Sequence, residues 1–443
     1  MLNLLRRIKR KLLSVESPKK SPVKAPVKAP VKSPVKAPVK APVKAPVKAP
    51  EKAPVKAPVK APEKAPVNID IYGNMFFPYK HIIHTGEGMT HGPSHLSQWI
   101  PVFSVSGEGF VVLVRNIDLF DWVRANYPYV TVIFAKGASD VETILNQLPF
   151  VKAFYYLSNT GNMIHSLRYN VYKHIFLGHG DSEKAASAHK FFRVYDEIWV
   201  AGEAHIDRFR NASFDTAHIK FVKIGRPMSK SAVKNVEDEP KTAKVLYLPT
   251  WEGVYEENNY SSLKLSATML REISLALEVP INIKFHPVSG SRDGTLKSID
   301  KKVSEVLSSV NADFNIADKL EPVGRLIRDS NIYICDISAV VSECLVTGYP
   351  IFVYIPSDRE ITISHSNMEY DDYAYTYSNV EELINQLNEL LEGNDPKKEA
   401  RLKARDYFIS VEQTKNDEFA RQLKRISEDH PLIHNSIEYG IKQ

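Results

Sequence analysis

The sequence predicts an α/β protein in which two domains, each made of parallel strands and covering helices, face a common cleft. Two observations support this fold class. Short apolar runs alternate with helical patterns from residue 110 onward, and such alternation is typical of a parallel sheet with helices on both faces. The alternation forms two series, one ending near residue 230 and one beginning near residue 242. We therefore expect domains at residues 68–235 and 236–443.

The charge of the chain separates the N-terminal part from the rest. The 443 residues carry a net charge of +6, but residues 1–66 contain 18 Lys and Arg against 3 Asp and Glu. The remaining residues therefore carry a net charge of −9. An acidic folded part argues against nucleic acid as its partner.

The N-terminal arm has the pattern of a surface anchor followed by a spacer. In residues 1–16, the leucines at positions 2, 5, 12 and 13 share a helical face with Ile8, and five basic residues cover the other faces. We expect this basic amphipathic helix to lie on an anionic membrane surface; a disordered or RNA-binding tail is the alternative. Residues 17–67 repeat Lys-Ala-Pro-Val, which predicts a disordered, extended linker.

The cysteines and the apolar runs indicate the compartment. Cys335 and Cys344 are the two cysteines of the chain and lack the spacing of a zinc module, as in a reduced cytoplasmic protein. No run reaches the roughly 18 apolar residues of a membrane-spanning helix, and the N-terminus does not resemble a signal peptide. We therefore predict a cytoplasmic protein that is peripheral on the inner face of the cell membrane.

In the first domain, six apolar runs are candidate strands. A helical pattern covers residues 118–126, and His81, His84, His91 and His95 lie in a Gly-rich segment before the first run. Their spacing fits neither a helical metal pair nor a zinc module, so we predict no metal site there. The six runs are residues 110–114, 130–135, 153–157, 175–177, 197–200 and 221–224.

Two loops of the first domain are candidate site segments, because ligands of parallel sheets gather at the carboxyl ends of strands. The run at 175–177 is followed by Gly178-His179-Gly180 and then by Asp181, which we interpret as a tight turn that exposes the imidazole and leads into a helix start. The alternative is a turn histidine without a role. Ser158, Asn159 and Thr160 follow the run at 153–157 and predict a loop lining the acceptor or a phosphate, with ordinary turn chemistry as the alternative.

The second domain repeats the pattern. We expect strands at residues 244–248, 281–285, 314–316, 332–335 and 350–354, and helices at residues 263–277, 301–310, 323–329, 379–392, 397–410 and 418–427, the last two closing the fold.

Three segments of this domain are candidate site residues. Thr250 follows the first strand, and His286 follows the second. Ser338 and Ala339 follow the strand at 332–335 and open a helix, whose free N–H groups suit a diphosphate. Simple N-capping by Ser338 is the alternative. We expect Asp336 to orient this loop and Glu343 to meet neutral hydroxyls. Two such Rossmann-like domains make an architecture of the glycosyltransferase-B kind, in which His179 and His286 would converge on the cleft.

Five motifs, in order, resemble those of the CDP-glycerol glycerophosphotransferases of teichoic acid and capsule synthesis. The resemblance covers roughly residues 150–360 and excludes the arm. The chain departs from the family where Gly-His-Gly-Asp-Ser replaces Trp-His-Gly-Thr-Pro, and where Glu343 replaces a common aspartate. The motifs are Gly178-His179-Gly180, Gly225-Arg226-Pro227, Pro249-Thr250-Trp251, His286-Pro287 and the segment from Asp336 through Ser338, Ala339 and Val340 to Glu343.

The resemblance implies transfer of a polyol phosphate from a CDP donor to a hydroxyl of a glycan or lipid-linked acceptor, with release of CMP. It implies that His179 is the catalytic base and that His286 binds or neutralises the transferring phosphate. Thr250, Ser338, Ala339, Glu343 and Arg226 would line the donor site, and Ser158, Asn159, Thr160 and Asp181 the acceptor side. No cofactor is certain, and a divalent cation stays open. The alternatives are a nucleotide-sugar glycosyltransferase of capsule synthesis and a non-catalytic membrane-tethered scaffold.

Overall fold

A computed structural model of the chain describes residues 79–180, 184, 187–233, 242–318 and 321–429. The predicted basic helix at residues 1–16, the repeat at residues 17–67 and the site candidate Asp181 lie outside the described residues. The described residues all belong to the unit formed by residues 65–443.

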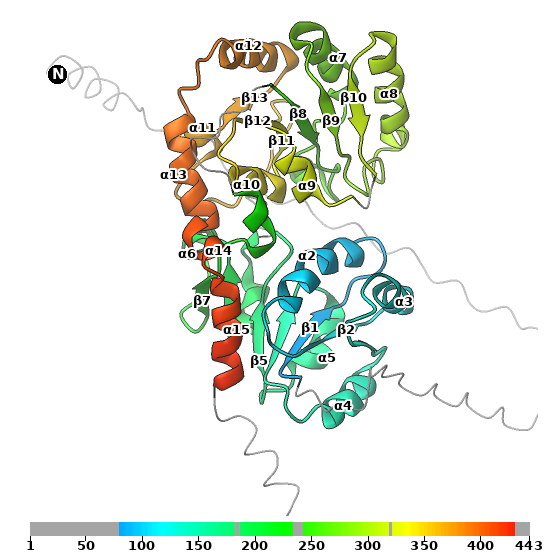
Figure 1. The fold of residues 1–443 in the computed structure, drawn as a ribbon, viewed down its shortest axis with the longest axis vertical. Helices are drawn as coiled ribbons and strands as arrows, with labels where there is room; N and C mark the ends of the chain where they lie inside the picture. Colours follow the sequence, from blue (N-terminus) through cyan, green and yellow to red (C-terminus); the bar gives the residue numbers. More distant parts are fainter. Residues whose placement is uncertain (1–78, 181–183, 185–186, 234–241, 319–320, 430–443) are drawn as a thin grey trace, which may run out of the picture. The chain divides into compact units, whose positions relative to one another are not determined.

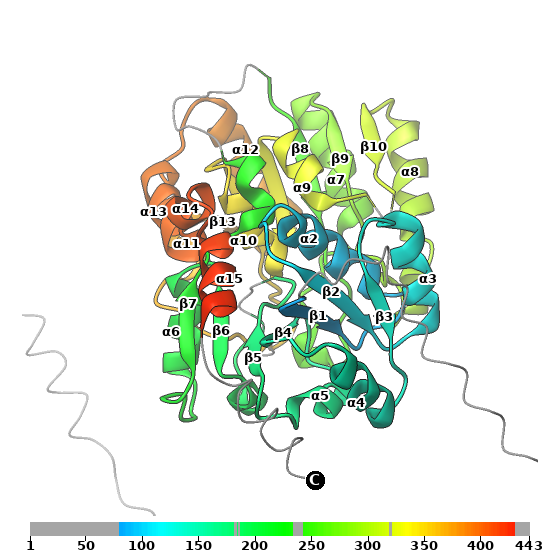
Figure 2. The ribbon, with the colours of Figure 1, turned by 60° about the horizontal axis from the view of Figure 1, so that its bottom comes forward.

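The first part of the described chain (Figure 1) forms a seven-stranded parallel sheet in the order β3-β2-β1-β4-β5-β6-β7, whose strands are all labelled in Figure 2. Its strands are β1 His81–Thr85, β2 Phe110–Val114, β3 Val132–Phe134, β4 Ala153–Tyr156, β5 Lys173–Phe176, β6 Glu197–Val200 and β7 Lys220–Lys223. Its helices are α2 Gly92–Ser104, α3 Ile117–Asn126, α4 Ala138–Gln147, α5 Ile164–Leu167 and α6 Glu203–Asn211, with the short 3-10 helices η1 Gly161–Met163, η3 Lys190–Val194 and η4 Pro227–Ala232.

The second part forms a six-stranded parallel sheet in the order β10-β9-β8-β11-β12-β13. Its strands are β8 Val245–Leu248, β9 Ile281–Ile283, β10 Phe314–Ile316, β11 Ile332–Asp336, β12 Ile351–Tyr354 and β13 Tyr375–Tyr377. Its helices are α7 Ser266–Leu277, α8 Ile299–Ser309, α9 Val323–Arg328, α10 Ala339–Leu345, α11 Tyr370–Tyr373 and α12 Val380–Leu391, with the 3-10 helices η5 Glu256–Asn258 and η6 Gly294–Leu296.

Each sheet is buried on both faces, which explains why its strands are continuous apolar runs. Along β2, Val112 and Val114 belong to one hydrophobic cluster, whereas Val111 and Leu113 belong to another. Successive side chains of a strand point to opposite faces, so a strand between two helical layers must be apolar at every position. These runs confirm the prediction of an α/β fold with two parallel sheets.

Both sheets have the strand order of a Rossmann-type fold, in which the order of successive strands reverses beside the first strand of each sheet. The reversal lies between β1 and β4 in the first sheet and between β8 and β11 in the second. Ligands bind such sheets outside the carboxyl ends of the strands at this point. The fold therefore directs attention to the loops after β1, β4, β8 and β11.

The central strand β1 corrects our interpretation of the Gly-rich segment. His84 in β1 lies beside Leu113 of β2 and Tyr156 of β4, and His81 and His84 are fully buried. The strand is not an apolar run, and hydrogen bonds hold both histidines in the core. The two ring nitrogens of His81 contact Tyr155 Oη at 3.0 Å and Ser427 Oγ at 2.9 Å. His84 Nδ1 contacts Ser166 Oγ at 3.0 Å, whereas its Nε2 has no partner among the described residues. A buried polar group with such partners is tolerated in a core.

The last helices connect the two sheets. After α13 Lys398–Ile409 and α14 Val411–Lys415, helix α15 Glu418–Glu428 lies against the first sheet in both views (Figures 1 and 2). Phe419, Leu423 and Ile426 of α15 belong to the same buried cluster as Trp99 and Trp199. The sequence predicts that all residues from 236 onward belong to the C-terminal domain. In the structure, however, the apolar face of α15 packs against the first sheet.

Candidate active site

The loop after β5 approaches the second domain closely. Gly178 has a φ of +67°, in the left-handed region that favours glycine. At Gly180, a Cβ atom would lie 2.6 Å from the Cβ of Ala339, so a side chain here would clash with the first residue of α10. The two glycines therefore let His179 lie at the junction of the β5 loop and α10.

The His179 ring is held in one tautomer. Its Nδ1 lies 3.1 Å from the carbonyl oxygen of Leu157, and because a carbonyl only accepts, Nδ1 must carry the proton. The surrounding protein desolvates the ring and lowers the pKa of His179 below its usual range, the Leu157 hydrogen bond opposes this shift, and the charge of Arg226 adds to it. The ring is therefore neutral at pH 7 and presents Nε2 as a proton acceptor.

A second histidine supports this ring. His95 stacks on His179 with ring centroids 4.0 Å apart and an angle of 12° between the planes, and His91 stacks on the far side of His95 at 6.1 Å. Burial lowers the pKa of His95 to about 2, with smaller contributions from the charges of His179 and His91. His95 is distant from His179 in sequence, so local pattern does not predict this contact; the four-residue spacing of His91 and His95 is the sequence signal that their rings lie on one helical face.

His286 follows β9 and has the opposite tautomer. The backbone N–H of Val288 donates to His286 Nδ1 at 3.4 Å, so the proton of the neutral ring is on Nε2. Trp251 stacks against the ring at 6.3 Å between centroids. His179 thus offers an acceptor nitrogen, whereas His286 offers a donor.

His179 is one of the groups whose charge affects the pKa of His286. The pKa of His286 falls to about 4, first because of burial and then because of nearby charges that include those of Lys184, His91 and His179. The His286 ring is therefore neutral in the free protein at pH 7, and it contributes an N–H donor rather than a positive charge.

Asp336, at the end of β11, organises the reversal point of the second sheet. Its carboxylate Oδ2 accepts the backbone N–H groups of Thr250 at 2.7 Å and Ser262 at 3.1 Å, so it ties the loop after β8 to β11, as expected from its position. Its Oδ1 has no partner among the described residues. Burial raises the pKa of Asp336 to about 7, against the hydrogen bonds and the charge of Lys184.

A lysine from the first domain reaches this point. Lys184 Nζ donates to Thr250 Oγ1 at 3.1 Å and lies 5.3 Å from the centre of the Tyr260 ring, and its backbone forms an antiparallel bridge with Ile363. Burial lowers the pKa of Lys184 to about 8, and Asp336 opposes this shift. Local sequence pattern does not identify Lys184 as a site residue, because its hydrogen-bond partner Thr250 is distant along the chain.

Arg226 and Glu343 pair with each other. Arg226 Nη2 donates to Glu343 Oε1 at 2.7 Å and to the carbonyl oxygen of His179 at 3.2 Å, and both charged side chains are largely buried. Because Glu343 belongs to α10, this ion pair connects the loop after β7 and the His179 loop to the second sheet. The sequence predicts that Arg226 and Glu343 line the donor site and that Glu343 contacts neutral hydroxyls. In this structure, Glu343 Oε1 accepts from the guanidinium group of Arg226.

A comparison of the sequence with protein-family models shows the family of the chain. The model of the CDP-glycerol:poly(glycerophosphate) glycerophosphotransferase family matches residues 176–423, which is more than half of the chain. The chain belongs to this family. It is therefore an enzyme of the CDP-glycerol glycerophosphotransferase class. A search of curated protein sequences finds no match to this chain.

Solved structures support the fold of this glycerophosphotransferase. A histidine-to-alanine variant of the wall teichoic acid polymerase TagF is 16% identical with a TM-score of 0.52, over 83% of this chain and 90% of that chain. A second TagF variant, soaked with CDPG, gives 14% identity, a TM-score of 0.52 and the same coverage. The Anabaena protein HepE in complex with UDP is 11% identical with a TM-score of 0.50, over 78% of this chain and 100% of that chain. At these identities the likeness concerns the fold, which is of the glycosyltransferase-B kind.

The remaining predicted donor-side residues of the glycerophosphotransferase lie at the start of α10. Ser338 occupies the N-cap position but makes no side-chain cap hydrogen bond; its Oγ donates to the carbonyl oxygen of Asp336 at 3.2 Å. Simple N-capping therefore does not account for Ser338. Ala339 is the residue that Gly180 approaches, so the start of α10 lies beside the His179 loop.

The predicted acceptor-side loop is only partly available to a ligand. Asn159 Oδ1 accepts from Tyr195 Oη at 2.6 Å, and Thr160 Oγ1 donates to Asn162 Oδ1 at 2.9 Å, so both side chains take part in the turn. Ser158 is buried, and its Oγ has no partner among the described residues. It directly follows Leu157, whose carbonyl group orients His179.

Neither a metal site nor a membrane span is found in the part of the chain that the structure describes. No group of three or more His, Cys, Asp or Glu side chains there is arranged to hold a metal ion. No helix there is long and apolar enough to cross a membrane.

Proposed function

We propose that this glycerophosphotransferase moves glycerol phosphate, or a similar polyol phosphate, from a CDP-activated donor to a hydroxyl of a glycan or lipid-linked acceptor. The products are a new phosphodiester and CMP, in the synthesis of a teichoic-acid-like or capsular polymer. The observation that carries the proposal is the pair of complementary imidazoles, His179 with Nε2 as an acceptor and His286 with an Nε2–H. The family description, CDP-glycerol:poly(glycerophosphate) glycerophosphotransferase, supports the choice of acceptor and polymer.

His179 is proposed to act as the base. The acceptor oxygen attacks the phosphorus that carries the polyol, and its proton passes to His179 Nε2. A hydroxyl is a poor nucleophile at neutral pH, so removing its proton during the attack lowers the barrier. The hydrogen bond from Nδ1 to the Leu157 carbonyl and the stacking on His95 hold the ring in one orientation.

His286 and Lys184 are proposed to stabilise the leaving group. The bond between the transferred phosphorus and the oxygen bridging to CMP breaks, and negative charge grows on that oxygen and on the transferring group. The Nε2–H of His286 and the ammonium group beside Thr250 supply donors and charge where this negative charge develops. The CDP donor would lie between the loops after β8 and β11, at the reversal point of the second sheet.

The donor distinguishes this function from its alternative. Purified protein is offered CDP-glycerol, CDP-ribitol and nucleotide sugars side by side with an acceptor polymer, and CMP release and the mass of the product are measured. We expect CMP release with a CDP-polyol and a mass increase of one or more polyol phosphate units. Transfer from a nucleotide sugar without CMP release from CDP-polyols would contradict the proposal and favour a glycosyltransferase. A repeat of the assay with a chelator tests whether a divalent cation is required.

We propose that the enzyme is attached to the inner face of the cell membrane through residues 1–16. The alternating leucines and basic residues of this segment support the proposal. Deleting residues 1–16 should move the enzyme from the membrane fraction to the soluble fraction while CMP release with a soluble acceptor is kept. A shortened protein that still sediments with membranes would show that other residues attach it.

A further inference from the structure

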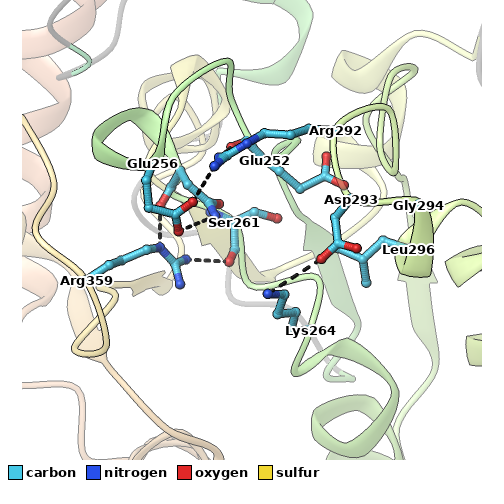
Figure 3. A pocket seen from close by; sticks show the side chains of 10 residues that line it. Glu252, Glu256, Ser261, Lys264, Arg292, Asp293, Gly294, Leu296 and Arg359 are labelled. Atoms are coloured by element: carbon cyan, nitrogen blue, oxygen red, sulfur yellow. Dashed lines mark hydrogen bonds and ion pairs between the residues drawn. The ribbon is translucent and has the colours of Figure 1, made fainter.

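The second domain contains a cavity of about 290 Å³ beside the predicted donor site. It lies between the loops after β8, β9 and β12, and six charged side chains surround it: Glu252, Glu256, Lys264, Arg292, Asp293 and Arg359 (Figure 3). Its wall is shared with the donor site, because Ser261 Oγ, which lines the cavity, donates to the carbonyl oxygen of Thr250 at 2.8 Å.

The positive charges of the cavity are already matched by protein acceptors. Arg292 pairs with Glu256 and donates to the carbonyl oxygen of Glu252 at 3.0 Å. Arg359 donates to the carbonyl oxygens of Asn259 at 2.7 Å and Ser261 at 2.9 Å (Figure 3). With Lys264 paired to Asp293 at 3.5 Å, the three cations face three carboxylates. The cavity therefore offers no excess positive charge to a phosphate.

Glu252 provides a free acceptor in this cavity. The side chain is only 3% exposed. Its Oε1 accepts the backbone N–H of Gly290 at 2.8 Å, whereas Oε2 has no partner among the described residues. A buried carboxylate oxygen without a donor is costly, and this oxygen belongs to a side chain that lines an open cavity.

Glu252 also joins the two donor-side loops. It lies two residues after Thr250, and its Oε1 holds Gly290 in the turn that begins at His286. A ligand group in the cavity would thus lie beside the loops that carry Thr250 and His286. The cavity can receive a neutral, hydrogen-bond-donating part of a donor whose phosphates lie at Thr250.

We propose that Glu252 Oε2 binds the vicinal diol of the CDP donor in this cavity. This inference rests on the proposed function and specifies how that donor is recognised. A carboxylate oxygen accepts hydrogen bonds from hydroxyls, an electroneutral lining suits an uncharged group, and the volume suits one sugar ring or a three-carbon polyol. Two parts of CDP-glycerol carry a vicinal diol, the ribose and the glycerol.

The test replaces the free oxygen and leaves the bound one. In Glu252→Gln, the amide oxygen can still accept from Gly290, but an NH₂ group replaces Oε2. We expect this variant to bind CDP-glycerol about 10- to 100-fold more weakly by titration calorimetry, the range for a hydrogen bond to a charged group. The matched control is Glu389→Gln, at an exposed glutamate of α12 that does not line the cavity, which should change affinity less than about fivefold. Thermal unfolding of each variant monitors folding.

The ligands identify which diol is bound. If Glu252→Gln weakens the binding of both CMP and CDP-glycerol, the ribose occupies the cavity; if it weakens only CDP-glycerol, the glycerol does. Wild-type protein offered deoxycytidine monophosphate and CDP-propanol, which lack one diol each, gives the same answer without a variant, and weaker binding of one of them is expected. Unchanged affinity in both experiments overturns the inference while the proposed function stands. Failure of the wild-type protein to bind any CDP compound would instead overturn the proposed function.

Discussion

Replacing His179 with alanine should lower the rate of CMP release from CDP-glycerol by about 10²–10⁴-fold, the usual contribution of a general base. Donor affinity should survive, because His179 belongs to the first domain and the donor is proposed to lie on the second. Turnover is measured as CMP release with a soluble acceptor, and donor affinity by titration calorimetry.

The pH dependence of the wild-type enzyme should reflect the same base. Burial lowers the pKa of His179, so the ring loses its base form only when the pH falls below the ordinary histidine pKa of about 6.5. Wild-type kcat/KM should therefore be level at pH 7 and decline below about pH 6.5.

The control for this prediction is His218→Ala. His218 is an exposed histidine of the first domain whose Nε2 contacts the carbonyl oxygen of Arg193 at 2.9 Å. This variant should turn over at the wild-type rate, which separates the loss of a base from a general effect of removing an imidazole. Near-normal turnover of His179→Ala would contradict the assignment, and so would a matching loss of donor affinity that explains the whole decrease.

The strands could be predicted from sequence wherever both faces of a sheet select apolar residues. The runs at 110–114 and 197–200 coincide with β2 and β6, because strands covered by helices on both faces are largely apolar. The charged residue of these runs, Glu197, is buried with Trp199 and Arg425 as hydrogen-bond partners. The strand β1 could not be predicted in this way. Its histidines are held in the core by hydrogen bonds, His81 with Tyr155 and Ser427 and His84 with Ser166, and those partners are distant in sequence.

Candidate site residues can be predicted from sequence where the residues next to them in the same loop set their position. Gly-His-Gly identified His179 because the glycines permit the turn, and His-Pro after a strand identified His286. The sequence does not show which side chain meets another across the domains. Lys184 reaches Thr250, and Arg226 meets Glu343, because the two sheets bring together loops that follow different strands. Local pattern therefore predicts candidate site residues, whereas the pairing of their charges depends on how the two sheets bring the loops together.

Replacing His286 with alanine should lower turnover by about 10²–10³-fold, the cost of removing one donor aimed at developing charge. The structure defines what is lost: Nδ1 accepts from Val288, so Nε2–H is the donor, and a pKa of about 4 keeps the free ring neutral at pH 7. His286→Gln retains an N–H donor and should lose less. Rates of CMP release at saturating CDP-glycerol compare the variants, with His365→Ala, an exposed histidine of the second domain, as the control. If His286→Gln loses as much turnover as His286→Ala while both variants fold and bind the donor, the N–H group is not what His286 contributes. The result would then favour a role that depends on the charged imidazolium.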